Sequence, residues 1–291
     1  MKGVIVSTLD LRDEISFEIK KVSNFQGVHL IIPKWGIEHK FTKDDDHKYS
    51  IYKALDMMLE KLDLTNYGIQ IEIFPNIPIA MGLGSSAALA VSILRALSNS
   101  FKLKLNDDEI NKLAFESEKI IHGSTSGLDN ILATHGKLIF YQKSQQLKIQ
   151  EINVSQPIPM VIGLTGIESL TVKMVNKVRT AWEKNKPLYE NLFKEIDQLS
   201  LNALSAIENY DLETLGELMN INQGILNALQ VSSSELEELV EIARNNGSIG
   251  AKLTGAGGGG AMIALCPDET ERVANAIRKA GYEAMVIELS S

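Results

Sequence analysis

Two carboxylates near the middle of the chain could act together on a bound phosphate or hydroxyl group. Glu118 falls near the end of a predicted helix, and Asp129 follows a turn rich in glycine, serine and threonine, where a second helix could begin. Phosphoryl transfer uses one carboxylate to hold Mg²⁺ and usually a second to orient or deprotonate the attacking hydroxyl. Acids on either side of a tight turn could reach one small cavity. The alternative, in which Glu118 is a surface helix residue and Asp129 caps a helix, remains open.

A second candidate site is the loop at residues 75–88, Pro-Asn-Ile-Pro-Ile-Ala-Met-Gly-Leu-Gly-Ser-Ser-Ala-Ala. An apolar predicted strand enters this loop, and a predicted helix leaves it. Gly82 and Gly84 let backbone N–H groups face a ligand, and the helix N-terminus adds unpaired donors, which together favour an anion such as phosphate. Ser85 and Ser86 could cap the helix, bind a phosphate oxygen or help to hold Mg²⁺. The loop has no Gly-Lys-Ser/Thr ending, so it is not a Walker A loop, and an ordinary strand–turn–helix remains the alternative.

A third stretch, residues 252–260, reads Lys-Leu-Thr-Gly-Ala-Gly-Gly-Gly-Gly and has five glycines in its last six positions. Such a run costs backbone entropy, and it lies between two strand-like segments where a flexible linker is not expected. It therefore favours close approach of the backbone to a ligand or to a neighbouring loop. A bulge or a crowded turn is the alternative.

The length and composition indicate a soluble globular protein of one large or two ordinary domains. The chain has 291 residues, 44% of them hydrophobic and 23% charged, with a net charge of −8 and no basic block. This balance argues against nucleic acid or an anionic membrane as the main partner. A single cysteine, Cys266, excludes an internal disulfide. With neither a signal-peptide pattern nor a long apolar run, the cytosol is the expected compartment.

Apolar periodicity predicts a mixed first half and a helix-rich second half. The charged residues 43–48 are expected to form a loop, and residues 154–159 a domain connection. Strands are predicted at 3–9, 14–20, 28–32, 67–74, 137–141, 147–152, 159–164 and 284–289, and helices at 51–62, 87–97, 110–121, 171–208 with a break near Pro187, 212–229, 234–246 and 268–280.

In this order and spacing, the three glycine-containing stretches resemble the GHMP kinase superfamily, and most closely its mevalonate kinases. The run from Glu118 through His122-Gly123 to Gly127-Leu128-Asp129-Asn130 is the most specific, and residues 165–171 and 218–224 also resemble mevalonate kinase segments. The resemblance covers about residues 3–289. It implies an α+β fold of two domains, 1–154 with a mixed sheet like that of ribosomal protein S5, and 155–291 with a ferredoxin-like sheet.

The resemblance also implies site residues and two cofactors, ATP and Mg²⁺. Carried over by position, Gly82, Leu83, Gly84, Ser85, Ser86 and Ala87 would bind ATP; Ser86 and Glu118 would hold Mg²⁺; Asp129 would be catalytic; and Thr254, Gly255, Ala256 and Gly257 would bind the substrate. The reaction implied is transfer of the γ-phosphoryl group of ATP to a hydroxyl of a small carboxylic acid, most closely mevalonate to 5-phosphomevalonate.

The resemblance begins after the family segment that usually carries a lysine and a Gly-Glu-His motif, because residues 3–12 resemble the next segment of these kinases. Two other interpretations stay open, and the missing segment favours the first of them. The chain could be an N-terminally truncated or non-catalytic nucleotide-binding protein, or a kinase with another acceptor such as phosphomevalonate or homoserine. A missing first strand would leave a bare sheet edge, from which we predict a possible homodimer.

Overall fold

The computed structural model describes two compact units that are interleaved along the chain. The described residues are 4–6, 15–22, 26–42, 50–75, 83–123, 125–143 and 147–290. The N-terminal unit holds residues 10–78 and 84–136, and the C-terminal unit holds residues 1–9, 79–83 and 137–291. The predicted domains, 1–154 and 155–291, divide the chain once, whereas each compact unit is made of more than one segment. A family domain boundary between residues 154 and 155 stays a prediction.

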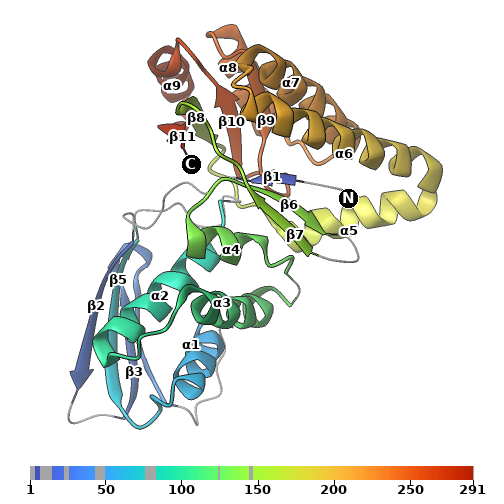
Figure 1. The fold of residues 1–291 in the computed structure, drawn as a ribbon. Coiled ribbons are helices and arrows are strands. Elements are labelled where there is room, and N and C mark those ends of the chain that lie inside the picture. The colour runs from blue at the N-terminus through green and yellow to red at the C-terminus, as the bar shows by residue number, and fades with distance from the viewer. Residues whose placement is uncertain are drawn as a thin grey trace. The chain divides into compact units, whose positions relative to one another are not determined.

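The N-terminal unit is a four-stranded sheet with helices packed on it (Figure 1). Its strand order is β2-β5-β3-β4, and β3 and β5 run parallel while the other pairs are antiparallel, so the predicted mixed sheet is confirmed. The elements are β2 (Ile15–Val22), β3 (Gly27–Ile32), the 3₁₀ turn η1 (Pro33–Trp35), β4 (Ile37–Phe41), α1 (Ser50–Lys61), β5 (Gly68–Pro75), α2 (Ser85–Phe101), α3 (Asp107–His122) and α4 (Leu128–His135).

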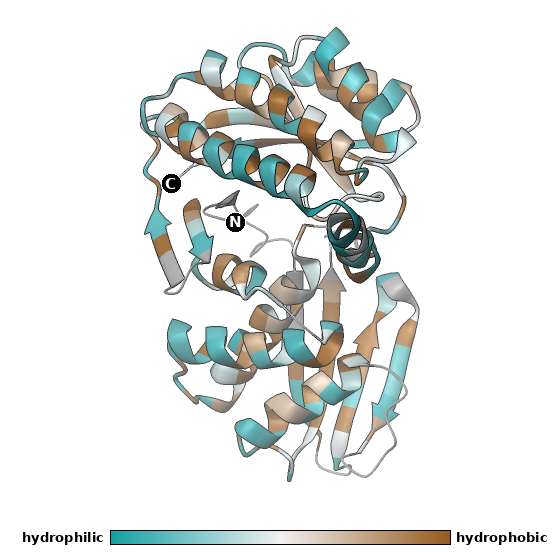
Figure 2. Cartoon of the chain, turned by 90° about the vertical axis from the view of Figure 1, so that its right-hand side faces the viewer, coloured by the Kyte–Doolittle hydropathy of each residue, from teal (hydrophilic) through white to brown (hydrophobic). Residues whose placement is uncertain are grey.

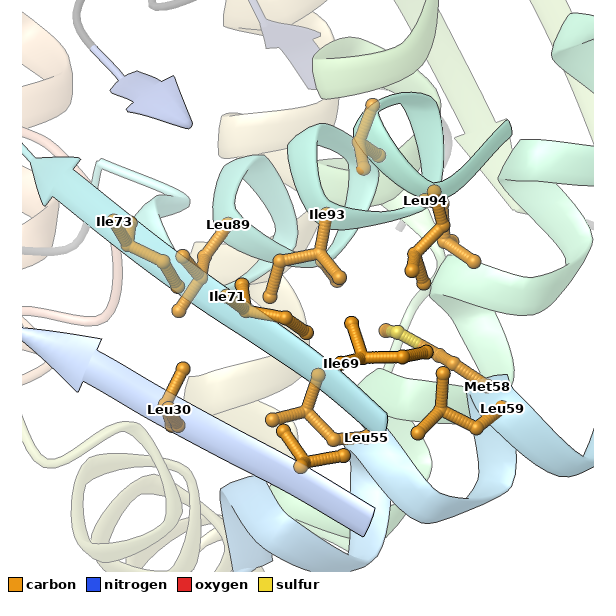
Figure 3. Packing of buried hydrophobic residues seen from close by; sticks show 14 of the residues in the cluster. Leu30, Leu55, Met58, Leu59, Ile69, Ile71, Ile73, Leu89, Ile93 and Leu94 are labelled. Carbon is orange, nitrogen blue, oxygen red and sulfur yellow. The ribbon is translucent and has the colours of Figure 1, made fainter. Parts of the chain in front are cut away.

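Alternating side chains of the central strands build the core of this unit. Successive strand residues point to opposite faces of a sheet, so every second residue of β3 and β5 is buried. Helices α1 and α2 cover that face with apolar residues spaced three and four apart. Figure 3 shows the resulting contacts among Leu30, Leu55, Met58, Leu59, Ile69, Ile71, Ile73, Leu89, Ile93 and Leu94.

The C-terminal unit contains two sheets. The three-stranded sheet has the order β1-β6-β7, and the four-stranded sheet has the order β11-β8-β10-β9 with antiparallel pairing. That order, with helices between β8 and β9 and between β10 and β11, is the predicted ferredoxin-like arrangement. The elements are β1 (Val4–Val6), β6 (Ile139–Lys143), β7 (Leu147–Glu151), β8 (Ile158–Leu164), α5 (Thr171–Lys184), α6 (Lys186–Glu208), α7 (Leu212–Ala228), α8 (Ser234–Asn245), β9 (Gly250–Leu253), β10 (Ala261–Leu265), α9 (Thr270–Lys279) and β11 (Glu283–Leu289).

The helices are amphipathic, and Figure 2 shows hydrophilic and hydrophobic residues alternating along them. None of the helices in the described part of the chain combines the length and the apolar character that crossing a membrane requires. The buried Cys266 has no disulfide partner.

Three sequence predictions concern residues outside the described ones. They are the loop at 43–48, the phosphate-loop residues before Leu83, including Gly82, and the segment after Val6 that carries the N-terminal resemblance. Among the described strands, β1 lies at one edge of its sheet, and dimerisation through such an edge stays a prediction.

Candidate functional site

The start of helix α2 has the geometry of an anion-binding helix terminus. Gly84 is the N-cap residue in the left-handed conformation (φ 70°), and no side chain among the described residues caps the helix. Ser85 and Ser86 are therefore the first two helical residues, and the alternative in which serine caps α2 is wrong. The first N–H groups of the helix are left for a ligand, and the helix dipole favours a negative one. Ala87 is fully buried beneath them, while Leu83 packs in the C-terminal unit against Ile162, Leu164 and Ala261.

Glu118 lies in the last turns of α3 and is buried, so the alternative of a surface residue is wrong. Only 2% of the residue is exposed, and its Oε1 atom has no hydrogen-bond partner among the described residues. Burial raises the pKa of this carboxyl; a hydrogen bond from Ser86 and the charge of His122 lower it in part, and Asp129 raises it further. An ionised carboxylate in this place is therefore short of partners, as a metal ligand would be in the absence of its ion.

His122 lies close to both predicted metal ligands, Ser86 and Glu118, and was not singled out as a site residue from the sequence. Its Nε2 atom lies 3.1 Å from Ser86 Oγ and 3.7 Å from Glu118 Oε2. The histidine follows Glu118 by four residues, which places both side chains on one face of α3. That spacing was the only available signal, because the third partner comes from a different helix.

Asp129 lies in the first turn of α4 and next to the α2 terminus. The N-cap of α4 is Gly127, so the alternative in which Asp129 caps a helix is wrong. A Cβ atom built on Gly84 would lie 3.5 Å from Asp129 Cβ, which places the carboxylate beside the backbone of the phosphate loop. Asp129 is open to solvent, yet the surrounding protein displaces part of its hydration and raises its pKa, while His122 lowers it. A raised pKa makes a carboxylate a better proton acceptor near neutral pH.

The residues around α2 and α3 fit Mg²⁺ bound together with phosphate. Within the described residues there is no cluster of three or more His, Cys, Asp or Glu side chains that could enclose a metal ion. Mg²⁺ does not require one, because it usually keeps several waters and binds one or two carboxylates plus substrate phosphates. Glu118 Oε1 is buried and has no hydrogen-bond partner among the described residues, while the Ser86 hydroxyl is hydrogen-bonded to the same carboxylate group.

The third stretch singled out from the sequence, residues 252–260, is called here the glycine stretch, and it divides into an exposed tip and a packed half. Thr254, Gly255 and Ala256 retain solvent exposure, whereas Gly257 is buried. A Cβ atom on Gly257 would lie 2.1 Å from the Val231 carbonyl oxygen, so the neighbouring loop occupies the space. The predicted close approach to a neighbouring loop is confirmed there, and the tip (Thr254–Ala256) remains accessible to a ligand.

Two side chains hold the packed half of this stretch. Ser169 Oγ donates to the Gly257 carbonyl at 2.8 Å, and Thr165 Oγ1 donates to the Gly260 carbonyl at 2.9 Å. The segment that resembles a mevalonate kinase segment at residues 165–171 is therefore a support for the glycine stretch.

The predicted site residues thus fall into two groups. Gly84, Ser85, Ser86, Glu118 and Asp129 are brought together in the N-terminal unit. Thr254 to Gly257 lie in the C-terminal unit. The roles of both groups stay predictions.

Comparison with known proteins gives consistent results for sequence and structure. Residues 50–137 match the family model of the GHMP kinases N terminal domain, and residues 203–283 match that of the GHMP kinases C terminal domain. The chain is 35% identical to mevalonate kinase of Pyrococcus furiosus, over 99% of this chain and 90% of that protein. It is 30% identical to mevalonate kinase of Methanothermobacter thermautotrophicus, over 99% of this chain and 91% of that protein.

Solved structures agree. The structure of L. major mevalonate kinase in complex with R-mevalonate matches with a TM-score of 0.84 and 25% identity, covering 99% of this chain and 94% of that one. Methanococcus jannaschii mevalonate kinase matches with a TM-score of 0.79 and 25% identity, covering 100% and 96%. The order of the three glycine-containing stretches, the ferredoxin-like sheet and these full-length relatives lead to one conclusion: the chain belongs to the mevalonate kinase family of the GHMP kinases.

Proposed function

We propose that this protein transfers the γ-phosphoryl group of ATP to the hydroxyl of a small carboxylic acid, and that the acid is mevalonate. The observation that carries the proposal is the buried carboxylate of Glu118 beside Ser86 at the start of α2, where neither Glu118 Oε1 nor the helix terminus has a side-chain partner in the part of the chain that the structure describes. Without a cation, this arrangement costs stability and has no structural benefit. With Mg-ATP, each of its features has a partner.

Each residue then has a defined task. The first N–H groups of α2 bind phosphate oxygens, and the left-handed Gly84 leaves the approach free of a side chain. Ser86 and Glu118 hold Mg²⁺, which when bound neutralises phosphate charge. Asp129 orients the acceptor hydroxyl and takes its proton, a role for which its raised pKa suits it.

The reaction balances without a further reactant. The hydroxyl oxygen forms a bond to the γ-phosphorus, and the bond from that phosphorus to the β–γ bridging oxygen breaks. ADP leaves with that oxygen, and the proton of the hydroxyl passes to Asp129 and then to solvent. Positioning and charge neutralisation supply most of the rate enhancement in such transfers.

The test is ADP release from Mg-ATP with mevalonate as the acceptor, and with homoserine, phosphomevalonate and no acceptor as comparisons. We expect release that depends on mevalonate and falls by at least about a hundredfold in Asp129→Asn, as removal of a general base does. Asp108→Asn, an exposed aspartate in the first turn of α3, is the matched control and should behave as wild type. Release with another acceptor would change the substrate assignment. No release, with Mg-ATP still raising the melting temperature, would indicate a nucleotide-binding protein without this activity.

A further inference from the structure

Strand β9 leads directly into the glycine stretch, and among the described strands none pairs with its outer edge. β9 pairs with β10 on one side only and is the last strand of its sheet. Outward-facing N–H and C=O groups at a sheet edge need other partners when the edge is covered. The groups that bind the outer edge of β9 therefore fix the position from which Thr254 and the exposed tip continue.

Two amide side chains of α7 bind this edge, and we call them the α7 amide pair (Asn220 and Gln223). Asn220 Nδ2 donates to the Ile249 carbonyl at 3.0 Å, and its Oδ1 accepts from the Ala251 N–H at 3.1 Å. Gln223 Oε1 accepts from the Leu253 N–H at 2.8 Å. A spacing of three residues places both amides on one face of the helix, and a spacing of two places both N–H groups on one edge of the strand. The helix therefore takes the place of a fifth strand.

The pair is itself held in one orientation. Gln223 is 2% exposed, and its Nε2 donates to Ser232 Oγ at 3.0 Å and to Glu237 Oε1 at 2.7 Å. With both donors and its acceptor occupied, the buried amide has only one satisfactory rotamer. Glycines allow the close approach, since a Cβ atom on Gly250 would lie 2.4 Å from the Gly216 carbonyl oxygen.

The outward carbonyl groups of β9 are also bound. Arg244 Nη2 donates to the Ala251 carbonyl at 2.8 Å, and Lys252 Nζ donates to the Leu253 carbonyl at 2.6 Å. Burial lowers the pKa of Lys252 to about 8. The N–H and C=O groups of Leu253 are thus both fixed by side chains one residue before the exposed tip of the glycine stretch.

We propose that the α7 amide pair consists of positioning residues for the phosphoryl acceptor, because it sets the position of the exposed tip (Thr254–Ala256) through the backbone of β9, at Ala251 and Leu253. This inference rests on the proposed function, in which that tip contacts the acceptor. The other end of the stretch is fixed by packing in the same unit, so a shift of Leu253 can only move or loosen the tip.

The test compares Asn220→Leu, which removes both hydrogen bonds at similar volume, with Asn220→Asp, which keeps an acceptor for the Ala251 N–H. Asn222→Leu is the matched control, because Asn222 lies on the same helix and its side chain makes no hydrogen bond to a described residue. Three quantities are measured: KM for mevalonate and kcat, the rise in melting temperature with Mg-ATP, and amide hydrogen exchange of residues 250–258. In Asn220→Leu we expect KM for mevalonate to rise about tenfold, equivalent to about 1.4 kcal/mol. Amide hydrogen exchange of residues 250–258 should be faster than in wild type, and the rise in melting temperature with Mg-ATP should be the same as in wild type.

Asn220→Asp should give intermediate values, and Asn222→Leu should match wild type. Faster exchange with unchanged KM and kcat would overturn the proposal, since the pair would then only stabilise the sheet edge. Unchanged exchange would also overturn it. If the wild type phosphorylates no acceptor, the proposed function fails separately. The amide pair is then judged by calorimetric binding of mevalonate together with exchange, and unchanged or absent binding refutes it.

Discussion

Replacing Glu118 with glutamine is expected to stabilise the ligand-free protein and to remove its response to Mg-ATP. Glutamine keeps the shape of the side chain but carries no charge. The carboxylate side chain is 3% exposed, and one of its oxygens has no hydrogen-bond partner among the described residues. The ionised group therefore loses hydration on folding without full compensation. A bound cation would offset this lost hydration.

The size of the effect follows from the charge of that unpaired group, because glutamine leaves a neutral polar atom in the same place and a charged group costs more than a neutral one. An unsatisfied buried polar group costs about 1–3 kcal/mol, and a chain of this length shifts in melting temperature by about 2 °C per kcal/mol. We expect Glu118→Gln to melt about 2–6 °C above wild type at pH 8 without ligand. Because burial raises the folded-state pKa of Glu118 above its ordinary 4.5, the folded protein binds this proton more tightly than the unfolded chain. The contribution of this proton to the stability of wild type is complete below the unfolded-state pKa and is lost as pH rises through the folded-state pKa. The difference in melting temperature between Glu118→Gln and wild type should therefore disappear at acidic pH.

The measurement is thermal unfolding at pH 5 and pH 8, with and without Mg-ATP. Glu116→Gln is the control, since Glu116 lies on the same helix at the surface, 3.8 Å from Lys61, and should change stability by less than about 1 kcal/mol. Wild type should gain stability from Mg-ATP, and Glu118→Gln should gain little. The reasoning is refuted if ligand-free Glu118→Gln melts below wild type at pH 8, or if Mg-ATP stabilises both proteins equally.

Two glycine substitutions separate backbone strain from loss of a site. Gly84→Ala and Gly36→Ala both place a side chain at positive φ (70° and 63°) without a severe clash, so each should lose about 1–2 kcal/mol in thermal unfolding. Only Gly84→Ala should raise KM for ATP, and equal KM values would argue against the anion site at α2. Gly257→Ala would bring a methyl group 2.1 Å from the Val231 carbonyl oxygen and should lower the melting temperature well beyond Gly166→Ala, which meets no atom within 4 Å at a similar φ. Similar melting temperatures for these two variants would contradict the packed arrangement of the glycine stretch.

Local signals in the sequence predicted the helices well. Asn106 and Glu109 form the capping box that begins α3, with each side chain bonded to the backbone N–H of the other. The break expected near Pro187 lies at Asn185, because proline fits the first turn of a helix and here is the second residue of α6. Such features depend only on neighbours in the chain.

Features that depend on residues far away in the sequence were harder to predict. Strand β4 was missed because only its end residues, Ile37 and Phe41, are apolar, and its three central residues are exposed at the sheet edge. The burial of Glu118 could not be read from its helix, since it requires α2 to pack alongside. Residues 218–224 were recognised as family-like, but their contact with β9 shows only in the structure, where a helix pairs with a strand about 30 residues later.

The interleaved order of the two units has a consequence for synthesis on the ribosome. The described strands and helices of the N-terminal unit lie between residues 10 and 136, so this unit can fold while the remaining half is still being translated. β1 emerges before the other described strands but pairs with β6, so Val4 can pair only after Tyr141 has been synthesised. The four-stranded sheet waits longer still, because β11, which pairs with β8, ends at Leu289. The unit that contains the first residues of the chain is thus completed last, and its leading strand stays unpaired until about half of the chain has been made.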